Sequence, residues 1–73
     1  MMLTAVGNII DMLLRRQESI TSDDIKALLK RANINISDTD LVKILITLEI
    51  YKKIYVKKVK KDGRDVFQIS RRR

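Results

Sequence analysis

The sequence contains no cysteine and no histidine, which removes much of the chemistry that small proteins commonly use. Without cysteine there are no disulfides or thiolate ligands, and without histidine the usual zinc ligands are missing as well. Without cysteine or histidine, the sequence also lacks the residues that most often act as nucleophile or general base in an enzyme. The two glycines, Gly7 and Gly63, cannot make a phosphate-cradling loop. We therefore expect a protein that is not an enzyme and that holds no metal and no cofactor.

Long apolar runs and aromatic residues are also scarce. No apolar run approaches the roughly 20 residues that a membrane-spanning helix needs, and the basic residues near the N-terminus follow the apolar part, unlike a secretory signal. We expect an intracellular, cytoplasmic protein that makes no contact with a membrane. The aromatic residues are Tyr51, Tyr55 and Phe67, too few and too scattered for a base-stacking platform. A chain of 73 residues has room for one domain with a small core.

Positive charge is abundant but unevenly placed. The formal net charge is +7. Residues 1–50 hold six basic and seven acidic residues, a net charge of −1, whereas residues 51–73 hold ten basic residues against two acidic ones, a net charge of +8. This asymmetry indicates a polyanion such as nucleic acid, or an anionic membrane surface, and of the two we expect nucleic acid. The alternative is that lysine and arginine only keep an edge hairpin soluble.

The first segment, residues 2–16, has apolar residues at helical spacing. The apolar arc spans about 200° of the helical wheel, roughly twice the stripe that one core contact requires. A second partner is therefore expected for this helix, and the small core argues in the same direction. We expect a homodimer whose interface on this helix consists of Met2, Leu3, Ile10 and Leu14.

Two further segments, ITSDDI and ISDTDL, repeat the pattern of a helix-capping box with a hydrophobic staple. Thr21 and Ser37 are the expected N-cap residues, and the helices that follow extend to about Ala32 and about Tyr51. Paired aspartates such as Asp38 and Asp40 could be imagined as metal ligands. Their position at a helix start instead predicts capping.

After Tyr51 the apolar period changes to two, which is typical of strands. The dipeptide Asp62-Gly63 favours a two-residue type I′ turn between strands at residues 55–59 and 66–70. This turn predicts four cross-strand pairs: Lys61 with Arg64, Val59 with Val66, Lys58 with Phe67, and Val56 with Ile69. Val56, Phe67 and Ile69 would then cover the helical core together with Ile54.

Three helices followed by a β-hairpin with a basic tip resemble the winged helix-turn-helix family. The resemblance is carried by ITSDDIKALLKRA, by ISDTDLVKILITLEIYKKI and by YVKKVKKDGRDVFQIS, and it covers about residues 3–70. It implies an α+β, mainly α, fold in which a three-helix core precedes the hairpin, or wing. It also implies one domain over residues 1–70 and a basic tail over residues 71–73. In this family the third helix usually enters the major groove of DNA, and the wing contacts the backbone or the minor groove.

The resemblance implies binding of double-stranded DNA, either sequence-specific or architectural, by a small homodimeric transcriptional regulator associated with the nucleoid. Phosphate contacts would come from the wing and the tail, and the third helix would supply groove-facing side chains. The wing and tail residues are Lys57, Lys58, Lys60, Lys61, Arg64, Arg71, Arg72 and Arg73, and the helix residues are Thr39, Lys43 and Thr47.

The third helix departs from the family pattern. Its outward side would present Ile46 and Ile50 where base-reading helices usually carry Arg, Asn, Gln or Ser, and Asp38 and Asp40 in its first turn would repel phosphate. The alternative function is therefore protein interaction or RNA binding within a larger complex. Ile46 and Ile50 could also pack on the wing or the first helix of the same chain. For Tyr55 we expect packing on the third helix rather than contact with a sugar or base.

Overall fold

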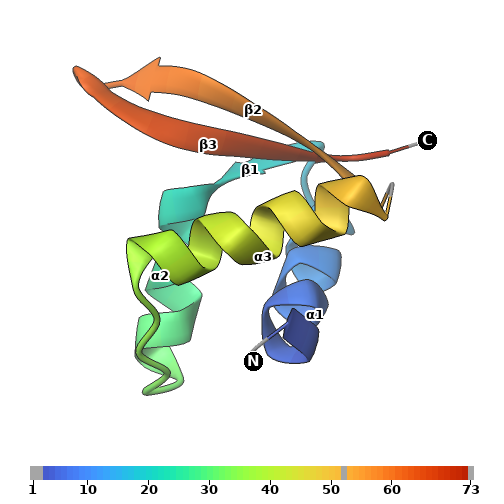
Figure 1. Ribbon diagram of the computed structural model, residues 1–73, viewed down its shortest axis with the longest axis vertical. Coiled ribbons are helices and arrows are strands. Elements are labelled where there is room, and N and C mark those ends of the chain that lie inside the picture. Colours follow the sequence, from blue (N-terminus) through green and yellow to red (C-terminus); the bar gives the residue numbers. More distant parts are fainter. Residues whose placement is uncertain (1–2, 52, 73) are drawn as a thin grey trace.

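The computed structural model describes residues 3–51 and 53–72, and within them it has three helices and three strands. In chain order these are α1 (Leu3–Leu14), β1 (Ser19–Thr21), α2 (Ser22–Arg31), α3 (Asp38–Ile50), β2 (Ile54–Lys61) and β3 (Arg64–Arg71). Figure 1 shows the sheet lying as one layer above the helices, with the turn of the β2–β3 hairpin extending beyond them. The α+β class expected from the sequence is confirmed. None of these three helices is long and apolar enough to cross a membrane.

The sheet is antiparallel, with strand order β1-β3-β2. All four expected cross-strand pairs of the hairpin are present, from Val56 opposite Ile69 to Lys61 opposite Arg64. Asp62 and Gly63 have φ angles of 52° and 78°, as a type I′ turn requires of its two central residues. The predicted hairpin and its register are therefore confirmed.

Strand β1 was not predicted. Its three residues pair with β3, with Ser19 opposite Ser70, Ile20 opposite Ile69 and Thr21 opposite Gln68. The sequence pattern had assigned Ile20 only to the capping of the second helix. In the structure the Ile20 side chain is buried in the core, and β1 makes β3 the central strand.

Both predicted N-caps are present. The Thr21 hydroxyl accepts a hydrogen bond from the Asp24 N–H at 3.3 Å, and the Asp24 carboxylate accepts one from the Thr21 N–H at 2.9 Å, which completes a capping box. At the start of α3, Ser37 Oγ accepts a bond from the Asp40 N–H at 3.1 Å. Each hydroxyl therefore satisfies a backbone donor that the first helical turn would otherwise leave unpaired.

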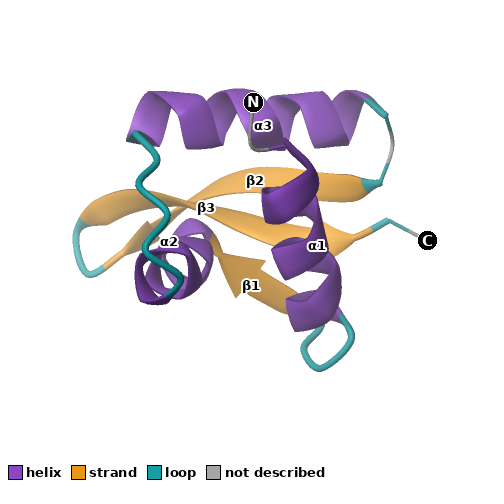
Figure 2. Cartoon of the chain, turned by 90° about the horizontal axis from the view of Figure 1, so that it is seen from below, coloured by secondary structure: helices purple, strands orange, loops and turns teal. Residues whose placement is uncertain are grey.

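The three helices cover one face of the sheet, as Figure 2 shows from the helical side. A single core cluster fills the space between them. Its buried members are Val6, Ile10, Leu14, Ile20, Ile25, Leu29, Leu41, Ile44, Leu45, Ile54 and Ile69.

The core uses much of the wide apolar arc of α1. Ile10 is 2% exposed and Leu14 is 8% exposed, so these two side chains are not available to a partner, and their assignment to a dimer interface is wrong. Leu3 is half-buried and packs against the same core, while Met2 lies outside the described residues. The physical reason is that α1 contacts α2, α3 and β1 within its own chain, which the helical wheel of one segment does not reveal.

Candidate nucleic-acid interface

The hairpin lysines lie on both faces of the hairpin. Because side chains alternate along a strand, Lys57 and Lys61 lie on the outer face, opposite the face on which Ile54 and Ile69 enter the core. By the same alternation, Lys58 and Lys60 lie on the face that carries Phe67, and all four lysines are exposed. The hairpin therefore carries positive charge on its two sides rather than in one stripe.

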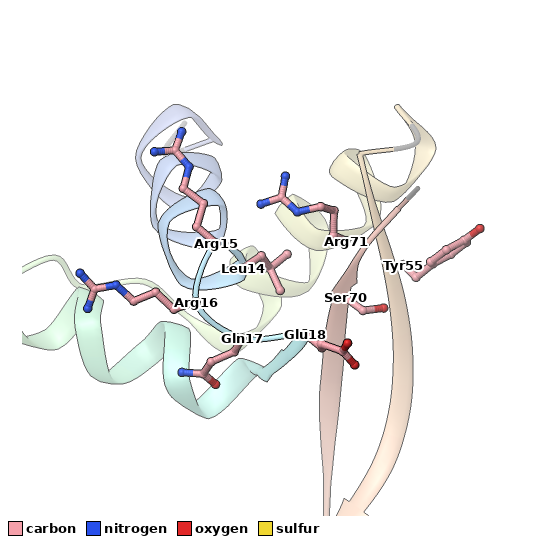
Figure 3. A pocket seen from close by; sticks show the side chains of 8 residues that line it. All are labelled: Leu14, Arg15, Arg16, Gln17, Glu18, Tyr55, Ser70 and Arg71. Carbon is pink, nitrogen blue, oxygen red and sulfur yellow. The ribbon is translucent and has the colours of Figure 1, made fainter.

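The basic residues after the hairpin lie at the opposite end of β3 from the turn. Arg71 is exposed, and the guanidinium carbon of Arg72 lies 4.5 Å from the centroid of the Tyr55 ring. Tyr55 is 48% exposed and lies on the outer face of the sheet, away from the helices, and in Figure 3 its ring points away from Arg71. The expectation that Tyr55 packs on the third helix is therefore wrong. Arg73 lies outside the described residues.

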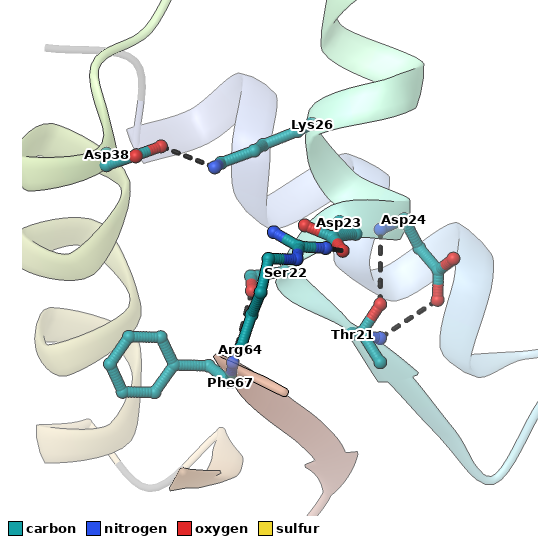
Figure 4. A network of polar contacts seen from close by, with 8 residues as sticks. All are labelled: Thr21, Ser22, Asp23, Asp24, Lys26, Asp38, Arg64 and Phe67. Atoms are coloured by element: carbon teal, nitrogen blue, oxygen red, sulfur yellow. Dashed lines mark hydrogen bonds and ion pairs between the residues drawn. The ribbon is translucent and has the colours of Figure 1, made fainter. Parts of the chain in front are cut away.

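Two of the predicted wing cations are engaged in ion pairs. Lys60 Nζ lies 3.1 Å from the Asp65 carboxylate, across the hairpin. Arg64 Nη2 lies 2.7 Å from the carboxylate of Asp23 in the first turn of α2, as Figure 4 shows. These pairs are exposed, and such pairs contribute only about 0–1 kcal/mol. Within the described residues, Lys57, Lys58 and Lys61 form no ion pair and are the free cations of the hairpin.

Acidic residues gather near the same end of the molecule as the hairpin turn. The first turn of α2 carries Asp23 and Asp24, and the first turn of α3 carries Asp38 and Asp40. Asp38 pairs with Lys26 at 2.5 Å, and both line a small hollow together with Asp65 of β3. The helix starts therefore offset part of the positive charge that the sequence concentrates in the hairpin.

Beyond its first turn, helix α3 presents few polar groups to solvent. Thr39 and Lys43 are exposed, but Thr47 is half-buried and its hydroxyl donates a hydrogen bond to the Lys43 carbonyl at 2.8 Å. Ile46 is 49% exposed and Ile50 is 70% exposed. Both isoleucines thus keep about half or more of their side-chain surface open to solvent. Their neighbour Tyr51, at the C-cap of α3, is 68% exposed and extends the apolar surface.

Two side-chain hydrogen-bond acceptors, which the sequence did not predict, connect the hairpin to the helices. The Glu49 carboxylate of α3 accepts a hydrogen bond from the Val56 N–H at 3.0 Å, and Ser22 Oγ of α2 accepts one from the Phe67 N–H at 3.1 Å. Their partners are 7 and 45 positions away, so no local pattern indicates them. Together these bonds orient the hairpin relative to α2 and α3.

In the part of the chain that the structure describes, no three acidic side chains come together as a metal site. Comparisons of the chain with protein-family models, with curated proteins and with solved structures find no match.

Proposed function

We propose that this chain is a winged-helix domain that binds double-stranded DNA through phosphate contacts made by the β2–β3 hairpin. Support comes from the element order and from a basic hairpin that follows three helices and extends beyond them. The observation that carries the proposal is that Lys57, Lys58 and Lys61 on this hairpin are exposed and form no ion pair with any residue that the structure describes. Lysine is a mobile point charge on a flexible stem, suited to phosphate contact without a fixed geometry.

The contacts are proposed to be architectural rather than sequence-specific. Base edges in the major groove are read by bidentate side chains such as Arg, Asn and Gln, which the outward side of α3 lacks. That side offers Thr39 and Lys43 beside the exposed Ile46 and Ile50. Phosphate contacts position a protein on DNA without specifying bases. A role in transcription would then depend on shape or assembly rather than on a base code read by α3.

The salt dependence of duplex binding tests this proposal. Each phosphate contact releases condensed counterions, so log affinity falls with log salt by about 0.9 per contact. Replacing Lys57, Lys58 and Lys61 together by Gln should reduce the steepness of this slope by about 2 to 3 on a duplex of random sequence. The binding loss should be nearly the same for different sequences, because no base contact is removed.

The matched control is Lys60→Gln, because this lysine is already paired with Asp65. It should change the slope by less than one-third of the triple variant's effect. A triple variant that keeps the wild-type slope, with unchanged circular dichroism, would exclude the hairpin as the phosphate-binding element.

A second candidate function is protein contact through α3, favoured by the exposure of Ile46, Ile50 and Tyr51. The proposed occupant is a second copy of the chain. Antiparallel pairing of two α3 helices about a two-fold axis would bring Asp40, in the first turn, toward Lys53 of the partner subunit, just after its helix end. Homodimerisation, expected from the sequence at α1, is thus proposed at α3.

A further inference from the structure

The outer face of the sheet, which points away from the helices, is left open. In Figure 1 the helices all lie on one side of the sheet, and no helix or strand within residues 3–51 and 53–72 lies over the other side. Opposite residues of an antiparallel pair share a face, and successive residues alternate between faces. The register therefore places three cross-strand pairs on the outer face: Tyr55 with Ser70, Lys57 with Gln68, and Lys61 with Arg64.

Positive charge dominates this face. The positions that β2 and β3 contribute to it include no acidic residue, because the strand aspartate Asp65 lies on the helix-facing side. Arg64 is paired with Asp23 of α2. Lys57 and Lys61, in contrast, are exposed and form no ion pair with any residue that the structure describes. The outer face is therefore complementary in charge to a chain of phosphates.

The same face carries an accessible aromatic ring. Tyr55 is 48% exposed, and the Arg72 guanidinium carbon lies over its ring, 4.5 Å from the centroid. In Figure 3 the ring points away from Arg71, which lies on the helix-facing side and lines a hollow of about 510 Å³ with Arg15. Tyr55 and Arg72 thus form a contact pair beside Lys57, which lies two positions, or roughly 7 Å, along β2.

We propose that the outer face of the sheet binds single-stranded nucleic acid, with one base stacked on the Tyr55–Arg72 pair and phosphates at Lys57 and Lys61. Aromatic rings and guanidinium groups both stack on bases, and stacking on a ring tolerates any base sequence. It requires a base that is not enclosed in a duplex. One ring supports one base, so charge supplies the rest of the affinity. This inference goes beyond duplex binding, with which it shares the two lysines.

The Tyr55–Arg72 contact also has a structural role. Together with a hydrogen bond from the Arg72 N–H to the Lys53 carbonyl at 3.5 Å, it holds the segment after β3 against the start of β2. That role affects folding stability and predicts no contact between the Tyr55 ring and a base. A measurement that reports on the ring itself therefore separates the two roles.

Intrinsic tyrosine fluorescence provides this measurement, because the chain has two tyrosines and no tryptophan. In Tyr51→Phe the remaining signal comes from Tyr55, and a bound single-stranded oligonucleotide should quench it, since a stacked base quenches tyrosine emission. The matched variant is Tyr55→Phe, which keeps a stacking ring and should bind the strand as tightly. Its remaining tyrosine, Tyr51, lies at the C-cap of α3 and should not be quenched. A bound complex in which Tyr55 emission is unchanged would overturn the proposal.

Binding of labelled single-stranded DNA, single-stranded RNA and duplex DNA to the full chain is measured by fluorescence anisotropy. Tyr55→Ile removes the ring but keeps a side chain that favours strands. It should weaken single-strand binding by about 5- to 150-fold and change duplex binding less than twofold. Binding of either single strand supports the proposal, and tighter binding of RNA would indicate a contact with the 2′-hydroxyl. A wild-type chain that binds no single strand, or equal losses for single strand and duplex in Tyr55→Ile, would contradict it.

Lys57 and Lys58 are a matched pair of neighbours on opposite faces, both exposed and without an ion pair among the described residues. Lys57→Gln should reduce the steepness of the salt slope for single strands by about 0.7, and Lys58→Gln by less than half as much. Equal effects would remove the assignment to the outer face. For duplex DNA the hairpin proposal expects both lysines to contribute, so either proposal can fail without the other.

Discussion

The backbone N–H of Phe67 donates a hydrogen bond to Ser22 Oγ at 3.1 Å, which joins the first residue of α2 to the central strand β3. Strand β1 ends one residue earlier, at Thr21, so the Ser22 hydroxyl serves as an acceptor beyond the end of the β1–β3 ladder. Ser22 is 7% exposed, which makes this acceptor hard for water to replace.

Ser22→Ala should lower the free energy of unfolding by about 1–2 kcal/mol, because it leaves the Phe67 N–H without a partner in a partly buried position. Urea denaturation measures the change. Ser19→Ala is the control, since Ser19 Oγ accepts its bond from the Gln68 side chain rather than from the backbone. The control should cost less than about 0.5 kcal/mol. Equal losses for the two variants would contradict the role given to Ser22.

Glu49→Ala should expose the backbone of the edge strand β2. The Glu49 carboxylate accepts a bond from the Val56 N–H at 3.0 Å, and its removal should lower the free energy of unfolding by about 1–2 kcal/mol. Amide hydrogen exchange at Val56 should become faster. Glu49→Gln keeps an acceptor oxygen and should lose less stability. Unchanged exchange at Val56 in the alanine variant would show that the bond does not hold the strand.

Gly63→Val should weaken the hairpin because Gly63 has a φ of +78°, which β-branched residues rarely adopt. The expected loss is about 1–2 kcal/mol, from backbone strain alone, because a Cβ at this position would meet nothing within 4 Å. Gly63→Asn should lose less, because asparagine tolerates positive φ. Thermal denaturation compares the two variants. A valine variant as stable as the asparagine variant would argue against the observed turn.

Ile50→Glu should dissociate a dimer formed through α3, since Ile50 is 70% exposed on that helix. Sedimentation at high micromolar concentration should give a dimer for the wild type and a monomer for the variant. Met12→Glu is the matched control, because Met12 is a 47% exposed apolar residue on α1. It should leave the dimer intact. A monomeric wild type, or dissociation by Met12→Glu, would remove the α3 interface.

Much of the local structure was predictable because its causes lie within a few residues. Asp62 and Gly63 adopt the positive φ angles of a type I′ turn, and the turn then sets the register of the hairpin. Thr21 and Asp24, three positions apart, form the predicted capping box. In contrast, strand β1 has three residues, too few to show a period-two pattern. It becomes a strand by pairing with β3, where Ile20 lies opposite Ile69, a residue far away in the sequence.

The candidate site was only partly predictable. The sequence indicated a basic hairpin, and its lysines are exposed. Which cations are free depends on residues distant in sequence, since Arg64 pairs with Asp23 of α2. The basic cluster of Arg15 and Arg71 has no sequence signal at all, because it exists only where β1 pairs with β3.

The sequence by itself determined the helix starts, the hairpin turn with its register, and the excess of positive charge after residue 50, because each depends on neighbouring residues or on composition. Only the tertiary structure decided that Ile10 and Leu14 are buried and that Arg15 lines a hollow with Arg71. Burial and charge pairing are properties of surfaces brought together from separate elements. A helical wheel or a charge count for one segment contains no information about the other surface.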